Sequence, residues 1–171
     1  MRKGGKMSSS RKGFTLIELM VVVIILGILT SIGVPYYVKT VESSKALDAV
    51  AMANMISSAT RMLMADNPSL TYNGGLLTHS DTCQTAPCST GGTRDACDLV
   101  RCRYLAAQNW DDLPYTYRSC NPTSGAGGSG CAAGLTASAR RRAGTYSAWG
   151  YTISSIGACN PVGGAPTCPS F

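Results

Sequence analysis

The sequence predicts an α+β protein in which one long N-terminal helix packs on a small antiparallel β-sheet. Three observations lead to this fold class. An apolar run and a stretch of helical periodicity together extend from Phe14 to Asp66. Beyond them, short runs of alternating apolar and polar residues are separated by turns rich in Gly and Pro, which is typical of strands. The chain also has eight cysteines, all after residue 82, which fit a small disulfide-held domain.

The first 13 residues form a polar, basic tail. They hold five of the fifteen basic side chains, so the rest of the chain has ten basic and nine acidic side chains despite a formal charge of +6. This basicity therefore indicates membrane orientation more than nucleic-acid binding. By the positive-inside rule, the N-terminus is expected in the cytoplasm and everything past Pro35 outside. The basic residues of the tail are Arg2, Lys3, Lys6, Arg11 and Lys12.

The apolar run is long enough to span a membrane but contains one acid. Leu19 to Val38 gives 20 consecutive residues without charge, which as a helix would be about 30 Å long. Glu18 precedes them, and a carboxylate in hydrocarbon costs roughly 2.5–3.5 kcal/mol at mid-bilayer. Cutting the bond between Gly13 and Phe14 would create a cationic α-amino group that can pair with Glu18, within one chain or between staggered chains. Pairing between chains would fix the register of an assembly.

These N-terminal residues resemble a known family. The segment Lys12-Gly13-Phe14-Thr15-Leu16-Ile17-Glu18, followed by an apolar helix, resembles the class III signal of type IV prepilins and of type II secretion pseudopilins. The resemblance covers about Arg11 to Ala65. It implies that Gly13 precedes the peptidase cut, that Phe14 becomes the N-methylated first residue, and that Glu18 takes part in assembly. Gly27 and Pro35 fall where many pilins carry helix-weakening residues.

The resemblance also implies a function and an organisation. The implied fold is type IV pilin-like, and the implied role is a structural subunit of a type IV pilus, a fimbrium that serves adhesion, motility or DNA uptake. Expected partners are identical or related pilin subunits, a prepilin peptidase/methyltransferase and an inner-membrane assembly platform. The protein would cross the inner membrane once, with a periplasmic head, and become extracellular after assembly. We expect a leader at 1–13, a transmembrane half-helix at 14–38, an amphipathic half-helix at 39–66 and a head at 67–171.

Three alternatives remain open at this stage. Ser31-Ile32-Gly33 offers a conventional small-x-small cleavage site, which would make the run an ordinary signal peptide or anchor. A type II secretion pseudopilin is the second alternative. Pseudopilins of that kind typically hold calcium in an acidic C-terminal loop, but no Asp or Glu follows Asp112, which favours a pilus subunit. The third is a monomeric anchored binding module that uses Arg140, Arg141 and Arg142.

The long helix is expected to change character along its length. Gly27, Gly33 and Pro35 predict a kink or local melting, because Pro35 leaves the carbonyl of Ser31 without its helical partner. The second half is expected to dock on the head through an apolar stripe. That stripe consists of Leu47, Ala51, Met55, Ala59 and Met62/Leu63.

The head is expected to begin with a turn-rich connecting loop. A short helix is predicted within 94–109, and strands at 113–117, 135–141 and 146–154 would form a sheet of three or four strands. A Gly/Ser-rich segment spans 123–134, and a Pro/Gly loop closes the chain.

The cysteines predict disulfides. An even number in an oxidising compartment indicates up to four bridges, and eight cysteines allow 105 complete pairings. Zinc competes weakly, because structural zinc sites use tighter Cys-x2-Cys spacing and His79 is the sole histidine. In the resembled family, a C-terminal disulfide loop often occurs, which implies a bridge between Cys159 and Cys168. The remaining candidates are Cys83, Cys88, Cys97, Cys102, Cys120 and Cys131.

The sequence contains no recognisable catalytic motif, metal site or cofactor site, so no enzyme activity is expected. Asp111-Asp112 fits a solvated turn better than an acid/base pair. Arg140-Arg141-Arg142, together with Arg118, gives residues 113–171 a charge of +4 with no acid among them. This run is expected either to blunt a sheet edge or to contact an anion such as a phosphate group, or another subunit.

Overall fold

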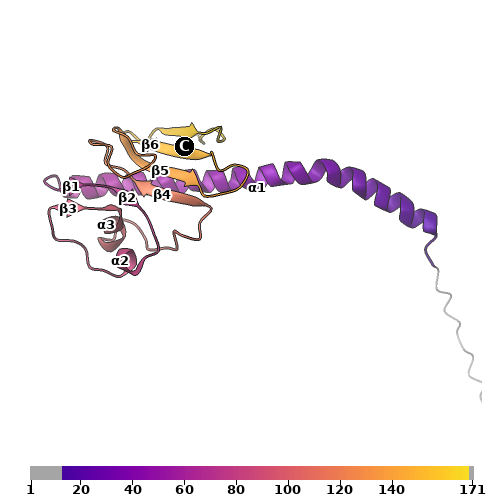
Figure 1. Ribbon diagram of the computed structural model, residues 1–171, viewed down its shortest axis with the longest axis horizontal. Helices are drawn as coiled ribbons and strands as arrows, with labels where there is room; N and C mark the ends of the chain where they lie inside the picture. The colour runs from indigo at the N-terminus through magenta and orange to yellow at the C-terminus, as the bar shows by residue number, and fades with distance from the viewer. Residues whose placement is uncertain (1–12, 170–171) are drawn as a thin grey trace, which may run out of the picture. The chain divides into compact units, whose positions relative to one another are not determined.

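The computed structural model describes residues 13–169, apart from the side chains of residues 81 and 82. The chain divides into two compact units, residues 1–41 and residues 42–171, which we call the N-terminal unit and the globular unit. One helix, α1 (Leu16–Asp66), belongs to both units. Figure 1 shows this helix and the strands of the globular unit. Each unit is described by itself.

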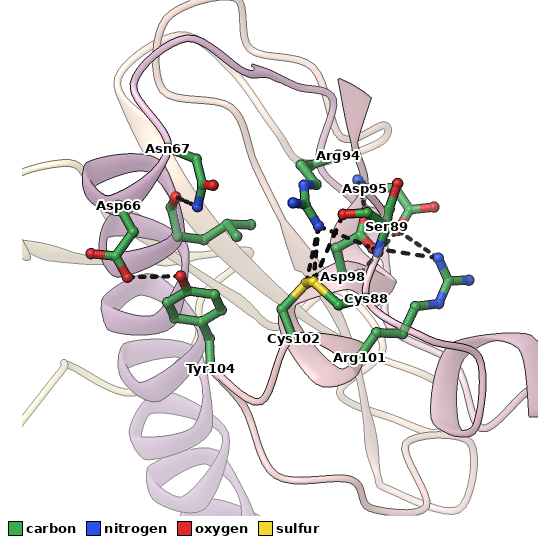
Figure 2. Close-up of a disulfide and its surroundings, with 11 residues drawn as sticks. Asp66, Asn67, Cys88, Ser89, Arg94, Asp95, Asp98, Arg101, Cys102 and Tyr104 are labelled. Carbon is green, nitrogen blue, oxygen red and sulfur yellow. Dashed lines mark hydrogen bonds and ion pairs between the residues drawn. A yellow bond between two sulfur atoms is a disulfide. The ribbon is translucent and has the colours of Figure 1, made fainter. Parts of the chain in front are cut away.

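Both ends of α1 are fixed by side chains. At its start, Thr15 and Glu18 exchange hydrogen bonds: Thr15 N donates to Glu18 Oε2 (2.8 Å), and Glu18 N donates to Thr15 Oγ1 (3.4 Å). This is a capping box, which satisfies backbone donors that a first helical turn leaves free. At its end, the Asn67 amide donates to the carbonyl of Leu63 (3.0 Å), and the Tyr104 hydroxyl donates to Asp66 (2.7 Å; Figure 2). The helix expected over 14–66 therefore spans 16–66.

The core of the globular unit is a five-stranded antiparallel sheet in the order β2-β4-β5-β6-β7 (Figure 1). A separate parallel pair joins β1 to β3. These elements confirm an α+β fold of the expected kind, with a long N-terminal helix and a small antiparallel sheet. The strands are β1 (Thr71–Tyr72), β2 (Gly75–Leu76), β3 (Thr93–Arg94), β4 (Tyr115–Ser119), β5 (Leu135–Arg141), β6 (Gly150–Ser154) and β7 (Cys159–Val162).

The sheet differs from the expected one at both edges. It has five strands, not three or four, because β2 and β7 lie in segments that read as loops. The first, β2, has only two residues, and β7 contains Pro161, so neither shows the alternation that marks a strand. The segment expected as one strand over 146–154 is strand only from Gly150, because residues 146–149 lie in the connection that follows β5.

Small residues of α1 pack against the sheet. Ala46, Ala49 and Ala53 are fully buried, which lets the helix backbone come close to the strands. Hydroxyl groups fill the remaining polar positions of this interface. Ser57 Oγ lies 2.7 Å from Thr136 Oγ1 in a buried hydrogen bond. Thr60 Oγ1 likewise lies 2.6 Å from Ser119 Oγ of β4, and Ile56 and Leu63 of α1 are also buried.

The prediction of which residues of α1 dock on the head was largely wrong. Leu47, Met55 and Met62 are 48%, 44% and 59% exposed, and Ala51 is also exposed. Only Ala59 and Leu63 of that stripe are buried. The buried face is rotated from the predicted one and is rich in Ala, Ser and Thr, which a count of large apolar residues overlooks.

The segment between α1 and β4 is held by disulfides and by two short helices, α2 (Asp81–Gln84) and α3 (Ala96–Arg101). Asp95 caps α3: its carboxylate accepts from Asp98 N, while Asp98 accepts from Asp95 N in return. Arg103 follows α3 in the left-handed region with φ of 64°, which is where helices usually place Gly. The short helix predicted within 94–109 is therefore α3.

Candidate functional site

The N-terminal unit presents an apolar helical surface. Every residue from Gly13 to Thr40 is exposed, and the large apolar side chains from Leu16 to Val38 are between 48% and 85% exposed. Among the described residues, α1 is the helix long and apolar enough to cross a membrane by length and composition, with a mean hydropathy of 2.6 in its most apolar window. A helix apolar on all sides needs lipid or other helices around it.

Glu18 is bonded within its own chain. Its Oε2 accepts from the backbone N–H and from the hydroxyl of Thr15, both at 2.8 Å. No cation pairs with it in the part of the chain that the structure describes. The capping box thus gives a carboxylate in an apolar segment a local partner. Sequence reasoning missed this role of Thr15, although Thr-x-x-Glu before an apolar run is its signal.

The two candidate cleavage residues precede the helix. Gly13 and Phe14 lie outside α1, and the Phe14 side chain is 88% exposed. The basic residues of the expected leader lie outside the described residues. The bond between Gly13 and Phe14 therefore lies in an exposed segment without secondary structure. A peptidase can bind the backbone of such a segment.

The helix continues through both candidate break positions. Pro35 lies inside α1, and residues 27–35 are helical throughout, so local melting, one of the two expected outcomes, is not found, and a kink stays a prediction. Polar side chains in this stretch bond back to the helix. Thr30 Oγ1 donates to the carbonyl of Leu26 (2.9 Å), and Ser31 Oγ donates to that of Ile28 (2.7 Å). Such bonds satisfy hydroxyl groups that lipid cannot.

The eight cysteines form four disulfides, and none is free. Two of the bridges, Cys83–Cys97 and Cys88–Cys102, each join residues 14 apart and overlap along the chain. Cys120–Cys131 closes the Gly-rich segment, and Cys159–Cys168 closes the C-terminal loop that the family resemblance implied.

A buried arginine lies against one of these bridges (Figure 2). Arg94 Nη1 donates to both sulfurs of Cys88–Cys102, at 3.0 and 3.1 Å. The same nitrogen lies 3.9 Å from the buried carboxylate of Asp98, which Arg101 also approaches at 3.6 Å. The arrangement ties β3, α3 and the disulfide together. No pattern in the sequence predicts this position of Arg94.

The three consecutive arginines are not one patch. Arg141 pairs with Glu42 of α1 through Nε–Oε2 (3.1 Å) and Nη2–Oε1 (3.2 Å), and both side chains are nearly buried. Arg142 donates to the carbonyls of Leu113 and Trp110. Of the three, only Arg140 forms no ion pair and no side-chain hydrogen bond with another described residue. The expectation of a sheet edge is also wrong, because β5 is the central strand.

Glu42 is a second residue that the sequence did not single out. Lys45 donates to its Oε1 at 2.7 Å, and Arg141 donates to both oxygens. Lys45, and then Arg141, hold the pKa of the Glu42 carboxyl below its ordinary value, against the opposing effect of burial. The Arg141 guanidinium also lies 5.7 Å from the centre of the Tyr115 ring. This cluster lies at the point within α1 where the globular unit begins.

Asp111 and Asp112 lie on the surface of the globular unit and bond to neighbouring residues. Asp111 accepts from His79 N (2.8 Å) and lies 3.6 Å from Arg142 Nη2, while Asp112 accepts from Asn109. Among the described residues, no three His, Cys, Asp or Glu side chains gather in a geometry that could hold a metal ion.

Comparison with known proteins gives one family match. Residues 8–34 match the family described as the prokaryotic N-terminal methylation motif. This range includes the candidate cleavage bond, Glu18 and most of the apolar run. No solved structure matches the chain.

Two relatives come from the bacterium Dichelobacter nodosus. A fimbrial protein is 35% identical over 94 residues, which cover 53% of this chain and 59% of the relative. A type IV major fimbrial protein FimA is 48% identical over 48 residues, or 28% of this chain and 30% of the relative. The alignments thus span between 30% and 59% of the length of these relatives. The identity is higher in the shorter of the two alignments.

Proposed function

We propose that this chain, which belongs to the type IV pilin family through its N-terminal segment, is a structural subunit of a type IV pilus. The observation that carries the proposal is the N-terminal methylation motif joined to an exposed apolar helix with a single acid near its start. The names of the relatives, all fimbrial proteins, support the pilus over a secretion pseudopilus. Their alignments cover only part of each protein, so the function rests on this segment.

The route to the filament begins with processing. A prepilin peptidase cuts between Gly13 and Phe14 and methylates the new amino group. Residues 14–38 then hold the cut chain in the inner membrane, with residues 39–66 and the disulfide-held head of residues 67–171 in the periplasm. An assembly platform in the inner membrane moves the chain into the filament. The exposure of Phe14 and of the apolar helix surface supports both steps.

Glu18 provides the register of assembly. In the uncut chain its carboxylate is occupied by the Thr15 hydroxyl and N–H. Cutting places a cationic amino group one residue from Thr15, and the amino group of a staggered neighbour is then the stronger partner for the carboxylate. Apolar packing alone favours no particular stagger, because lipid buries the same surface. The charge pair supplies the missing preference.

The role is structural and needs no catalysis. Several charged groups of the globular unit lie in ion pairs and capping interactions, and its cysteines lie in disulfides. We propose that it coats the filament surface. Disulfides persist in the oxidising conditions there and would stabilise a domain with a thin core.

Electron microscopy of a deletion strain tests the proposal. Cells without this chain should lose a class of surface filament, and a wild-type copy should restore it. Antibodies against the globular unit should label those filaments along their length. Filaments that persist unchanged in the deletion strain and lack this chain would contradict the proposal and favour a monomeric anchored module.

A further inference from the structure

The outer face of the sheet, opposite α1, carries two arginines without acidic partners. In β4, Tyr115, Tyr117 and Ser119 are buried on the α1 side, so Arg118 points to the other face. In β5, Arg140 pairs in register with Thr116, and Ser138 pairs with Arg118, which places Arg140 on that same face. Arg118 and Arg140 are therefore diagonal neighbours across two strands, within reach of a common ligand.

The charge of this pair is not neutralised. In the part of the chain that the structure describes, neither Arg118 nor Arg140 forms an ion pair. Arg118 Nη1 donates to the carbonyl of Gly127 at 3.0 Å, and its other donors remain available. Both side chains are partly exposed. The sequence after Asp112 contains no acid.

A glycine-rich segment, residues 127–130, lies close to both arginines. A Cβ atom at Gly128 would come within 2.5 Å of Arg118 Nη1, and one at Gly130 would lie 3.4 Å from Arg140 Nε. Both glycines have φ near +90°, so side chains are disfavoured there for two reasons. A Cβ at Gly150 of β6 would also lie 2.8 Å from Arg140 Cδ. Glycines thus leave the space in which the two guanidinium groups lie.

A buried hydroxyl group at the same place lacks a partner. Ser138 is 1% exposed, and its Oγ has no hydrogen bond in the structure. The Oγ lies 3.3 Å from the position that a Cβ on Gly130 would take, next to Arg140 Nε. Buried hydroxyls are nearly always hydrogen-bonded, so this one points to a polar partner that the free chain does not contain.

We propose that Arg118 and Arg140, with Ser138 beneath them and residues 127–130 beside them, form a binding site for a phosphate or sulfate group. Two guanidinium groups offer planar, paired donors that match the oxygens of such an anion. The site goes beyond the filament role, since it needs neither cleavage nor assembly. It uses one of the three consecutive arginines together with Arg118, which lies 22 residues earlier in the sequence.

Titration of the full chain in nonionic detergent micelles with inorganic phosphate tests the site. Isothermal calorimetry or amide NMR should show saturable binding, with the strongest chemical shift changes at residues 127–130. Arg140→Gln should weaken binding about tenfold, because a charge-assisted hydrogen bond is lost. Arg118→Gln should do the same, but it also removes the bond to Gly127, so Arg140→Gln is the decisive variant. Arg140→Lys should fall between the wild type and Arg140→Gln, since it keeps the charge and loses the planar fork.

Arg103→Gln is the matched control, because Arg103 is exposed and lies in a different part of the globular unit. It should bind phosphate as the wild type does. Tripolyphosphate distinguishes the source of the anion: tighter binding than phosphate indicates a polyanionic ligand, and equal binding indicates a single group. Absence of saturable binding to the wild type, or equal losses in Arg103→Gln and Arg140→Gln, would overturn the proposal. Neither result would affect the filament role, which the deletion strain tests separately.

Discussion

Glu42 and Arg141 join the start of the globular unit to its central strand. Replacing Glu42 with Gln leaves a nearly buried guanidinium with the carbonyl of Pro114 and the Tyr115 ring as partners. Loss of a hydrogen-bonded charge in such a place should lower the free energy of unfolding by about 2 kcal/mol. Chemical denaturation at pH 7 measures this. Lys45→Gln is the control and should cost less than about 0.5 kcal/mol, because Lys45 is 41% exposed.

The Glu42 carboxyl also makes the stability of the globular unit depend on pH. The pKa of Glu42 is lowered in the fold, chiefly by Lys45 and then by Arg141, so folding favours the ionised carboxylate. Its contribution is complete above the unfolded pKa of about 4.3 and is lost as the pH falls through the lower folded pKa. The stability difference between wild type and Glu42→Gln should therefore shrink as the pH drops from 5 towards about 3. A difference that stays constant over this range would show that the carboxylate charge is not what stabilises the fold.

Arg103 has a backbone conformation that glycine adopts more easily. Its φ of 64° lies in the left-handed region just after α3. Arg103→Gly should raise the free energy of unfolding by about 0.5–1 kcal/mol, after allowance for the greater freedom of Gly in the unfolded chain. Arg103→Ala keeps a Cβ atom and should leave stability unchanged. If the two variants behave alike, backbone strain at this position does not matter.

At the scale of elements, two overlapping disulfides differ in their surroundings. Cys83–Cys97 and Cys88–Cys102 join residues equally far apart, but Cys83 is fully buried whereas Cys88 is exposed. Arg94 also contacts both sulfurs of the second bridge and would stabilise the thiolate that reduction releases. Cys88–Cys102 should therefore be reduced before Cys83–Cys97.

Limited reduction followed by alkylation and mass spectrometry measures this order. Cys88 and Cys102 should be labelled at a lower concentration of dithiol than Cys83 and Cys97. Arg94→Gln should slow the reduction of Cys88–Cys102, so the two bridges should be reduced at more similar concentrations of dithiol. Earlier labelling of Cys83 and Cys97 in the wild type would show that exposure and the neighbouring cation do not control reduction.

The elements differ in how far the sequence predicts them. The limits of α1 follow from a long apolar run, a Thr-x-x-Glu start and Asn67-Pro68 after its end, all of which act locally. The face of α1 that is buried depends on how closely the sheet approaches, and this is not written in the helix itself. Likewise β2 and β7 are strands because β4 and β6 offer free edges, so their own residues give little sign of it.

The candidate site shows the same division. Gly13, Phe14 and Glu18 form a contiguous motif, and the sequence suffices to propose their roles. The arginine run was misread because successive residues of a strand face opposite sides of a sheet. Arg141 turns to Glu42 and Arg140 turns away, and only the strand register brings Arg140 next to Arg118. Disulfide pairing is equally non-local, since any of 105 pairings satisfies the cysteine count.

At the scale of the whole molecule, the proposed role of Glu18 connects one side chain to filament assembly. Glu18→Gln keeps the apolar segment at least as favourable for membrane insertion and leaves the cut site intact, so processed chain should accumulate. Assembly should fail, because a neighbour's buried amino group loses its countercharge, at a cost of several kcal/mol. Counting surface filaments by electron microscopy, with Thr30→Val as a control in the same helix, measures this. Filaments of normal length and number in Glu18→Gln would refute the proposed charge pairing.

Mass spectrometry of filaments sheared from the cell surface tests the central claim most directly. A filament subunit of this family should appear there as a chain that begins at Phe14, carries one methyl group on its α-amino nitrogen and contains four intact disulfides. A chain that begins at Met1, or at Val34 after conventional signal cleavage, would contradict the account. So would its absence from filaments that the cells still assemble.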